Sequence, residues 1–160
     1  MKLKTIVIGA FGIASVFILT AFISLPIANL GYINLGDAMI MLFCSFFEAS
    51  SLGFLVSGLA SALSDLYLGF SQYALFTLLI KGCEGALIVL LRRHRVPLSI
   101  AYLAGGLIVV IGYGLTDVFL TMQWASLIPS MAMNLIQISV SVLIASLLSK
   151  PFMKAVHKLM

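Results

Sequence analysis

The residues that could do chemistry in this chain are a few polar side chains within long apolar stretches. Lys81 and Glu84 lie three positions apart, so on a helix they share one face and can form an ion pair. Two hydroxyl groups, those of Tyr73 and Thr77, extend the same helical face. Charged groups in such surroundings usually face the interior of a helix bundle or an aqueous cavity. The stripe therefore predicts a polar interior, and a buried structural ion pair is the alternative.

Two more polar stripes with helical spacing follow later in the chain. One contains Tyr113, Asp117 and Thr121, and the other contains Ser130, Asn134, Gln137 and Ser141. They supply hydrogen-bond donors and acceptors, but the sequence has no nucleophile–base arrangement, nucleotide-binding loop or metal-type cluster. We therefore expect binding without catalysis, and we expect no cofactor and no metal.

The composition indicates which elements must position these stripes. Of the 160 residues, 62% are hydrophobic and 9% are charged, whereas a soluble domain carries about a quarter of its residues as charged ones. So few charges cannot cover a water-facing surface. A soluble enzyme, a nucleic-acid-binding module and a disordered tail are excluded, despite the formal net charge of +4. We predict an all-α integral membrane protein.

Breaks in hydropathy divide residues 1–160 into six predicted transmembrane helices, which form a single compact membrane domain. A helix needs about 20 apolar residues to cross a hydrocarbon core of about 30 Å. The second predicted span is shorter than that. The predicted spans are Thr5–Leu25, Asp37–Phe47, Ala49–Leu68, Tyr73–Leu91, Leu98–Leu120 and Ala125–Leu148.

The basic residues predict the orientation of this bundle. Eight of the nine lie on one side of a six-span arrangement, and the loops near 26–36, 68–72 and 120–126 on the other side have none. Basic residues that flank spans remain in the cytoplasm, so both termini are expected there. The same clusters can contact lipid headgroups. They are Lys2 and Lys4; Arg92, Arg93 and Arg95; and Lys150, Lys154 and Lys158.

With this orientation the three stripes lie mainly in the outward half of the bundle. The outer loops add four residues at the same level, namely Tyr32, Asn34, Asp37 and Trp124. We therefore predict a polar pocket open to the outside and capped by aromatic side chains, which binds a small polar ring by hydrogen bonds and stacking. The alternative is a structural or regulatory membrane protein whose stripes only join helices.

Small residues at four-residue spacing predict close contacts between helices. Gly53, Ser57 and Ser61 in the third span fit packing within the bundle. Ala10 and Ala14 belong to the first helix, which can present its small face to a partner protein.

Several short motifs together resemble the substrate-binding (S) components of energy-coupling factor (ECF) vitamin transporters. The first-loop motif Gly31-Tyr32-Ile33-Asn34-Leu35-Gly36-Asp37-Ala38 is one of them, and Ala10 and Ala14 fit the Ala-x-x-x-Ala pattern of these proteins. The resemblance covers nearly the whole chain. The other matching segments are Ser61–Leu66 with Gly69, Phe76–Gly85, Gly112-Tyr113 and Asn134–Gln137.

The resemblance implies a fold, a function and partners. S components have six helices and an outward-facing vitamin pocket, and they work with a transmembrane coupling subunit and two ATPase subunits in the cell membrane of a bacterium. By the resemblance, Ala10 and Ala14 would dock onto the coupling subunit. The nearest group is similar to the S components for riboflavin, hydroxymethylpyrimidine and pyridoxine-type vitamins. The many polar groups in a small pocket favour a single ring, hydroxymethylpyrimidine or pyridoxine, over the three fused rings of riboflavin.

Overall fold

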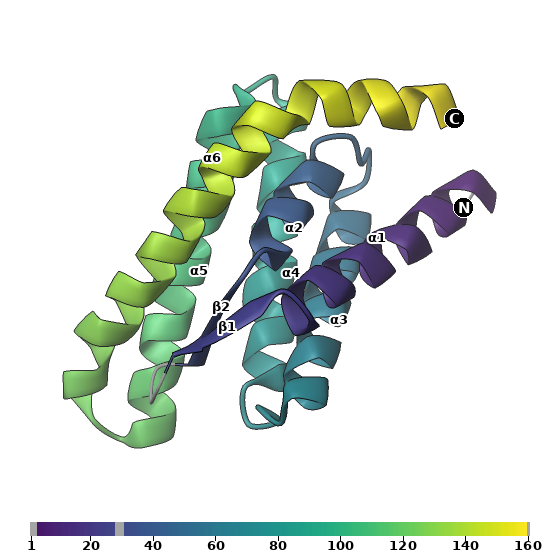
Figure 1. Cartoon of the computed structure of the whole chain (residues 1–160). Helices are drawn as coiled ribbons and strands as arrows, with labels where there is room; N and C mark the ends of the chain where they lie inside the picture. The colour runs from purple at the N-terminus through teal and green to yellow at the C-terminus, as the bar shows by residue number, and fades with distance from the viewer. Residues whose placement is uncertain (1–2, 28–30, 160) are drawn as a thin grey trace.

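The computed structural model describes residues 3–27 and 31–159, and within them it shows six α-helices, a two-stranded hairpin and a short 3-10 turn (Figure 1). The chain begins with helix α1, continues through the hairpin and four further helices, and ends with the long helix α6. In order, the elements are α1 (Leu3–Ala21), β1 (Ser24–Ile27), β2 (Gly31–Asn34), α2 (Gly36–Cys44), α3 (Ser50–Leu68), α4 (Ala74–Arg93), α5 (Leu98–Thr121), η1 (Trp124–Ser126) and α6 (Leu127–Leu159).

Four helices, α3 to α6, are long and apolar enough to cross a membrane. The prediction of six helices is confirmed, but six spans were predicted, the second of them short, and among the described residues four helices have the length of a membrane span. Helix α2 has nine residues and a length of about 14 Å at 1.5 Å per residue, which is too short to cross alone. The apolar part of α1, Thr5–Ala21, is also shorter than the other four.

The predicted boundaries are accurate for the three middle helices and wrong for the outer ones. α3, α4 and α5 begin and end within about two residues of the predicted positions. α1 ends at Ala21 rather than Leu25, because the chain then enters the hairpin. α6 continues past the predicted end at Leu148 to Leu159, although Pro151 lies inside it.

The segment predicted as a loop, 26–36, contains most of the hairpin. β1 and β2 pair antiparallel, with Ser24 opposite Asn34 and Pro26 opposite Tyr32. Proline has no backbone N–H to donate. It is tolerated here because each strand of a two-stranded sheet is an edge strand, with one side whose backbone groups pair with no other strand. The hairpin ends in a tight turn, where the Asn34 side-chain oxygen accepts the backbone N–H of Gly36 at 2.7 Å.

The buried centre of the bundle is built around α2. Ile40, Met41 and Phe43 of this helix are inaccessible or nearly so, and Val16 of α1 and Val56 of α3 belong to the same apolar core. α3 and α4 lie very close together, since a Cβ added at Gly53 would come within 2.8 Å of the Gly85 carbonyl oxygen. The predicted small-residue packing within the bundle is therefore confirmed for Gly53.

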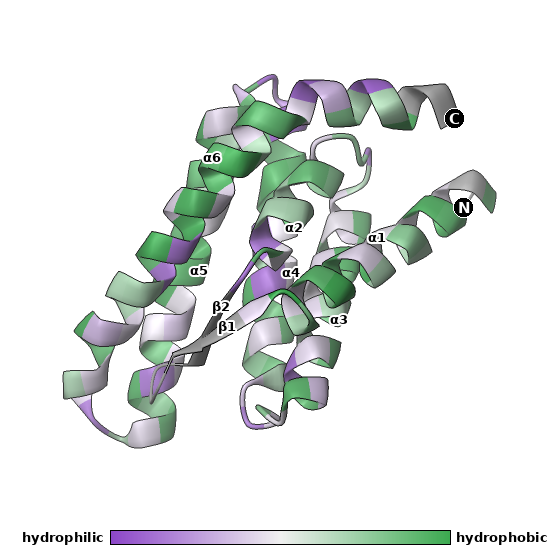
Figure 2. Ribbon diagram, viewed as in Figure 1, coloured by the Kyte–Doolittle hydropathy of each residue, from purple (hydrophilic) through white to green (hydrophobic). Residues whose placement is uncertain are grey.

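The outer surface of the bundle is apolar, and polar residues lie inside it. Large side chains such as Leu79, Leu107 and Leu115 are about half exposed, as expected for helices that face lipid. Figure 2 shows hydrophilic positions on α2 and α4 where these two helices lie side by side in the middle of the molecule. This interior polar region contains the candidate site.

Candidate functional site

Asp37 is the centre of the candidate site. It lies in the first turn of α2 with 1% of its surface exposed. Its Oδ1 accepts a hydrogen bond from the Lys81 ammonium of α4, with which it forms an ion pair. Its Oδ2 accepts the side-chain amide N–H of Gln137 of α6 at 2.5 Å. One carboxylate thus joins three helices, and its position at a helix N-terminus favours its negative charge.

Gln137 links this carboxylate to the hairpin. While its amide nitrogen donates to Asp37, its oxygen Oε1 accepts the backbone N–H of Asn34 at 3.1 Å. Asn34 in turn holds the start of α2 through its side chain. We call this group the buried polar cluster; its members are Asn34, Asp37, Lys81, Glu84 and Gln137. All of them except Asn34 are at most 6% exposed.

Glu84 has a different environment from Asp37. It is fully buried, and its Oε2 lies 3.5 Å from the Lys81 nitrogen. Neither of its carboxylate oxygens makes a hydrogen bond with the part of the chain that the structure describes. The predicted Lys81–Glu84 pair is therefore present, but the hydrogen-bonded partner of Lys81 is Asp37. Helical spacing could reveal only the partner on the same helix, whereas Asp37 lies 44 residues earlier.

The stripes of α4 and α5 pair with each other. The Tyr73 hydroxyl donates to Asp117 at 2.5 Å, and the Thr77 and Tyr113 hydroxyl oxygens lie 2.8 Å apart. The Lys81 nitrogen lies 5.6 Å from the centre of the Tyr113 ring, within reach of a cation–π contact. These pairs form a continuous polar seam that leads along α4 to the buried polar cluster.

Tyr73 precedes α4, in the turn that follows α3. Burial raises the pKa of its phenol, and the hydrogen bond to Asp117 raises this pKa further. The phenol therefore stays protonated at neutral pH and remains a hydrogen-bond donor to the carboxylate.

Two residues predicted for the site, Asn134 and Trp124, do not join the cluster, and the side chain of a third, Tyr32, is not among those that the structure describes. The Asn134 amide donates to the Ser130 carbonyl of its own helix at 3.0 Å. Trp124 is 74% exposed in η1. The backbone of Tyr32 pairs with Pro26 in the hairpin, but its side chain lies outside what the structure describes.

Two further side chains of α6 share the helical face of Gln137. Ser130 and Ser141 are buried, and their hydroxyl groups make no hydrogen bond to any described residue. The sequence placed both serines in the α6 stripe but not among the predicted binding residues. Ser130 lies seven residues before Gln137 and Ser141 lies four residues after it, and this helical spacing could have placed both among the predicted binding residues.

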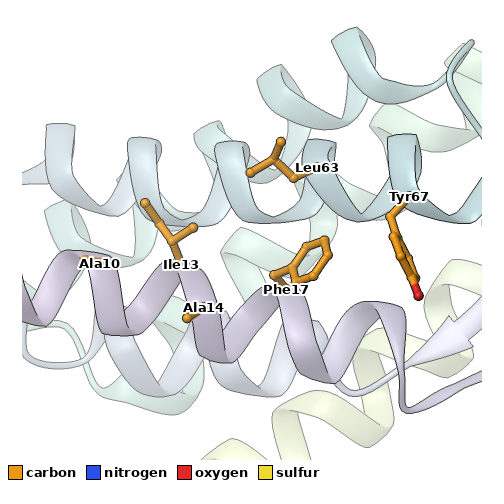
Figure 3. Close-up of a pocket in the computed structure, with 6 residues that line it drawn as sticks. All are labelled: Ala10, Ile13, Ala14, Phe17, Leu63 and Tyr67. Carbon is orange, nitrogen blue, oxygen red and sulfur yellow. The ribbon is translucent and has the colours of Figure 1, made fainter.

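Ala10 and Ala14 lie on another surface of the molecule. Both are exposed on α1 and line an apolar groove between α1 and α3 with a volume of 410 Å³ (Figure 3). The Phe17 and Tyr67 rings, 5.8 Å apart, lie at one end of this groove. By contrast, a Cβ at Gly12 would meet the side chains of Val56 and Phe43 in the core. α1 thus presents Ala10 and Ala14 outward and packs its glycines inward.

These features define a small helical membrane protein with a buried polar cluster and no group of three His, Cys, Asp or Glu side chains, among the described residues, that could hold a metal. A family model described as "ECF-type riboflavin transporter, S component" matches residues 1–154. The chain therefore belongs to the family of ECF-type riboflavin transporter S components. This is a family of transport subunits rather than of enzymes.

Two individual relatives have sequences similar to this chain. The chain is 29% identical over 155 residues to the thiamine precursor transporter HmpT of Lactococcus lactis subsp. cremoris (strain MG1363), covering 92% of this chain and 87% of the relative. It is 37% identical over 103 residues to an uncharacterized protein in a gap 3′ region of Pyrococcus woesei, covering 62% of this chain and 68% of the relative.

A solved structure has the same fold. It is described as "Structure and mechanism of the S component of a bacterial ECF transporter" and superimposes with a TM-score of 0.57 at 18% sequence identity. The match covers 98% of this chain and 95% of the other. The resemblance to S components seen in the sequence motifs is therefore confirmed at the level of family and fold.

Proposed function

We propose that this chain is the vitamin-binding subunit of an ECF-type importer and that it captures a single-ring vitamin or vitamin precursor, such as hydroxymethylpyrimidine or pyridoxine. Family membership supports the role of S component. The full-length similarity to a thiamine precursor transporter supports the precursor class. The ligand enters from outside, both termini are cytoplasmic, and a transmembrane coupling subunit with two ATPase subunits releases the ligand inside.

The observation that carries this proposal is the free hydrogen-bonding capacity of the buried polar cluster. Both Glu84 carboxylate oxygens are buried and make no hydrogen bond within the described residues, although Oε2 has an ionic contact with the Lys81 ammonium at 3.5 Å. A buried polar group left in this state costs about 1–3 kcal/mol. A ring with an amino or hydroxymethyl group would supply the missing donors. The unpartnered hydroxyls of Ser130 and Ser141 add capacity on α6.

The contacts between helices favour a single ring over riboflavin. Lys81 of α4 and Gln137 of α6 each bond directly to Asp37 of α2. A long slot for three fused rings would have to separate these bonded groups. Riboflavin nevertheless remains the second candidate, because the family model carries its name.

The proposed site consists of the buried polar cluster and the seam between α4 and α5. Tyr32 and Trp124 remain proposed aromatic contacts at the outer end, and Asn134 remains a proposed polar contact on α6. Ala10 and Ala14 are the proposed docking residues for the coupling subunit. The full proposed set is Tyr32, Asn34, Asp37, Thr77, Lys81, Glu84, Tyr113, Asp117, Trp124, Asn134 and Gln137.

The test is a ligand panel on the purified chain, without coupling module or ATP. Hydroxymethylpyrimidine, pyridoxine and riboflavin are added separately, and the thermal unfolding midpoint is measured. A ligand at one hundred times its dissociation constant stabilises the folded state by about 2.7 kcal/mol, so a single-ring compound should raise the midpoint. A shift with riboflavin alone would replace the proposed substrate. If no compound changes the midpoint, the proposed substrate class is wrong and the structural or regulatory alternative gains support.

A further inference from the structure

The end of the molecule that contains the α4–α5 connection carries exposed cations that form no ion pair with the residues that the structure describes. They are Arg93, Arg95, Lys150 and Lys154. Among the described residues, the acidic side chain at this end is Glu48, and it pairs with Arg92 at 3.0 Å. The other four acidic residues, Asp37, Asp65, Glu84 and Asp117, belong to α2, α3, α4 and α5. We call the four exposed cations the basic surface.

The last part of α6 extends beyond what a membrane crossing needs. The helix has 33 residues and a length of about 50 Å, compared with a hydrocarbon core of about 30 Å. Pro151 lies inside it and has no backbone N–H to donate, which bends a helix. Figure 1 shows the yellow end of α6 turning away from the rest of the helix and running across the end of the bundle.

An aromatic cluster holds this bent segment in place. The Phe152 ring lies 5.4 Å from that of Phe43 and 5.9 Å from that of Phe46. Phe47, in contact with both of these rings, has its carbonyl bound by the Arg92 side chain at 2.7 Å. The end of α4 and the end of α6 are thereby fixed to the same point. Lys150 and Lys154, four residues apart, then share one exposed face of the bent segment.

Arg95 occupies a position where glycine is usual. α4 ends with the Val96 N–H bonded to the Leu91 carbonyl at 3.1 Å, and Arg95 has a φ of 61°. Most helices that end in this way carry glycine at the left-handed position, because a side chain is strained there. A cation kept at a strained, exposed position points to a role for its charge.

We propose that the basic surface binds the headgroups of anionic phospholipids and that it holds the bent end of α6 in the plane of the membrane interface. The segment has the composition of an interfacial helix, because Lys150 and Lys154 are exposed on one face and Phe152, two positions from each, lies on the opposite face of the helix. Four to eight basic residues directly beside membrane helices are typical of sites for anionic lipids. The clustered positive charge without free acidic neighbours complements a phosphate-rich surface.

The test measures lipid selectivity with the whole chain. The protein is purified in detergent with equal amounts of phosphatidylglycerol and phosphatidylcholine, and the lipids that stay bound are counted by native mass spectrometry. We expect a several-fold excess of phosphatidylglycerol on the wild-type protein. Lys150→Gln with Lys154→Gln should reduce this excess several-fold, whereas Lys150→Arg with Lys154→Arg should retain it. Equal retention of both lipids by the wild-type protein would overturn the proposal.

The variant Arg95→Gly tests the effect of the Arg95 charge on lipid binding separately from its effect on the stability of the fold. Glycine relieves the strained φ, so the unfolding midpoint should stay the same or rise while the phosphatidylglycerol excess falls. An unchanged excess in both Arg95→Gly and the double glutamine variant would overturn the proposal. If these variants kept lipid selectivity but lost assembly with the coupling module, the basic surface would be a protein-docking surface instead.

Discussion

Among single residues, Lys81 sets the charge balance of the site, because two buried carboxylates, those of Asp37 and Glu84, share its one ammonium group. Helical spacing alone indicated Glu84 as the partner. The two carboxylates differ in their use: Asp37 is fully engaged by Lys81 and Gln137, while Glu84 has no hydrogen-bond donor among the described residues. We therefore assign Asp37 to holding the site together and Glu84 to binding the ligand.

Lys81→Met should be the most destabilising single change in the cluster. It removes the one ammonium group between Asp37 and Glu84 and leaves buried charge uncompensated, which costs about 3–5 kcal/mol. Asp37→Asn should cost less, because Lys81 keeps Glu84 as a partner and the amide oxygen can still accept from Gln137. Denaturant unfolding of both variants in detergent measures the difference. Equal losses would mean that Glu84 does not act as a second partner of Lys81.

At the scale of the elements, α2 is the feature that the sequence predicted least well. It was expected as a short span, but it is a nine-residue helix enclosed by the others. Its charged end contributes Asp37 to the cluster, and its apolar end contributes Phe43 to the aromatic cluster. The hairpin before it was missed because a four-residue strand with Pro26 in it has no clear two-residue periodicity. In contrast, α3 to α5 were predictable because each is a long apolar stretch between polar breaks.

The exposed alanines of α1 make a prediction about docking. Ala10→Trp with Ala14→Trp should fill the groove between α1 and α3 and prevent close approach of a partner helix. Vitamin binding by the purified chain should persist, because neither residue contacts the buried polar cluster. Vitamin uptake by cells should be abolished.

Leu79→Trp is the matched control for this docking experiment. Leu79 is also an apolar residue on the surface, half exposed, but it belongs to α4 and does not line the groove between α1 and α3. It should leave both binding and uptake unchanged. If the α1 double variant loses binding as well as uptake, the two alanines are needed for packing within the chain rather than for docking.

At the scale of the whole molecule, the polar stripes were informative because helical periodicity fixes which residues share a face. The stripe of α4 identified Thr77 and Lys81 correctly as interior groups, and the stripe of α5 identified Tyr113. Periodicity could not show which stripes face each other, so the contacts from Asp37 to α4 and α6 came from the structure alone. It also could not distinguish Gln137, which joins the cluster, from Asn134, which bonds within its own helix.

The central claim, that the buried polar cluster binds a single-ring vitamin or precursor, is tested most directly by calorimetric titration of three purified proteins with hydroxymethylpyrimidine. The wild-type chain and Glu48→Gln, a control at an exposed carboxylate, should bind with equal affinity. Glu84→Gln should remain folded, because the Lys81 ammonium keeps its hydrogen-bonded partner Asp37 when its 3.5 Å ion pair with Glu84 is removed. It should bind about tenfold or more weakly, as expected when a hydrogen bond to a charged group, worth about 1.5–3 kcal/mol, is removed. Wild-type affinity in a folded Glu84→Gln protein would contradict the account.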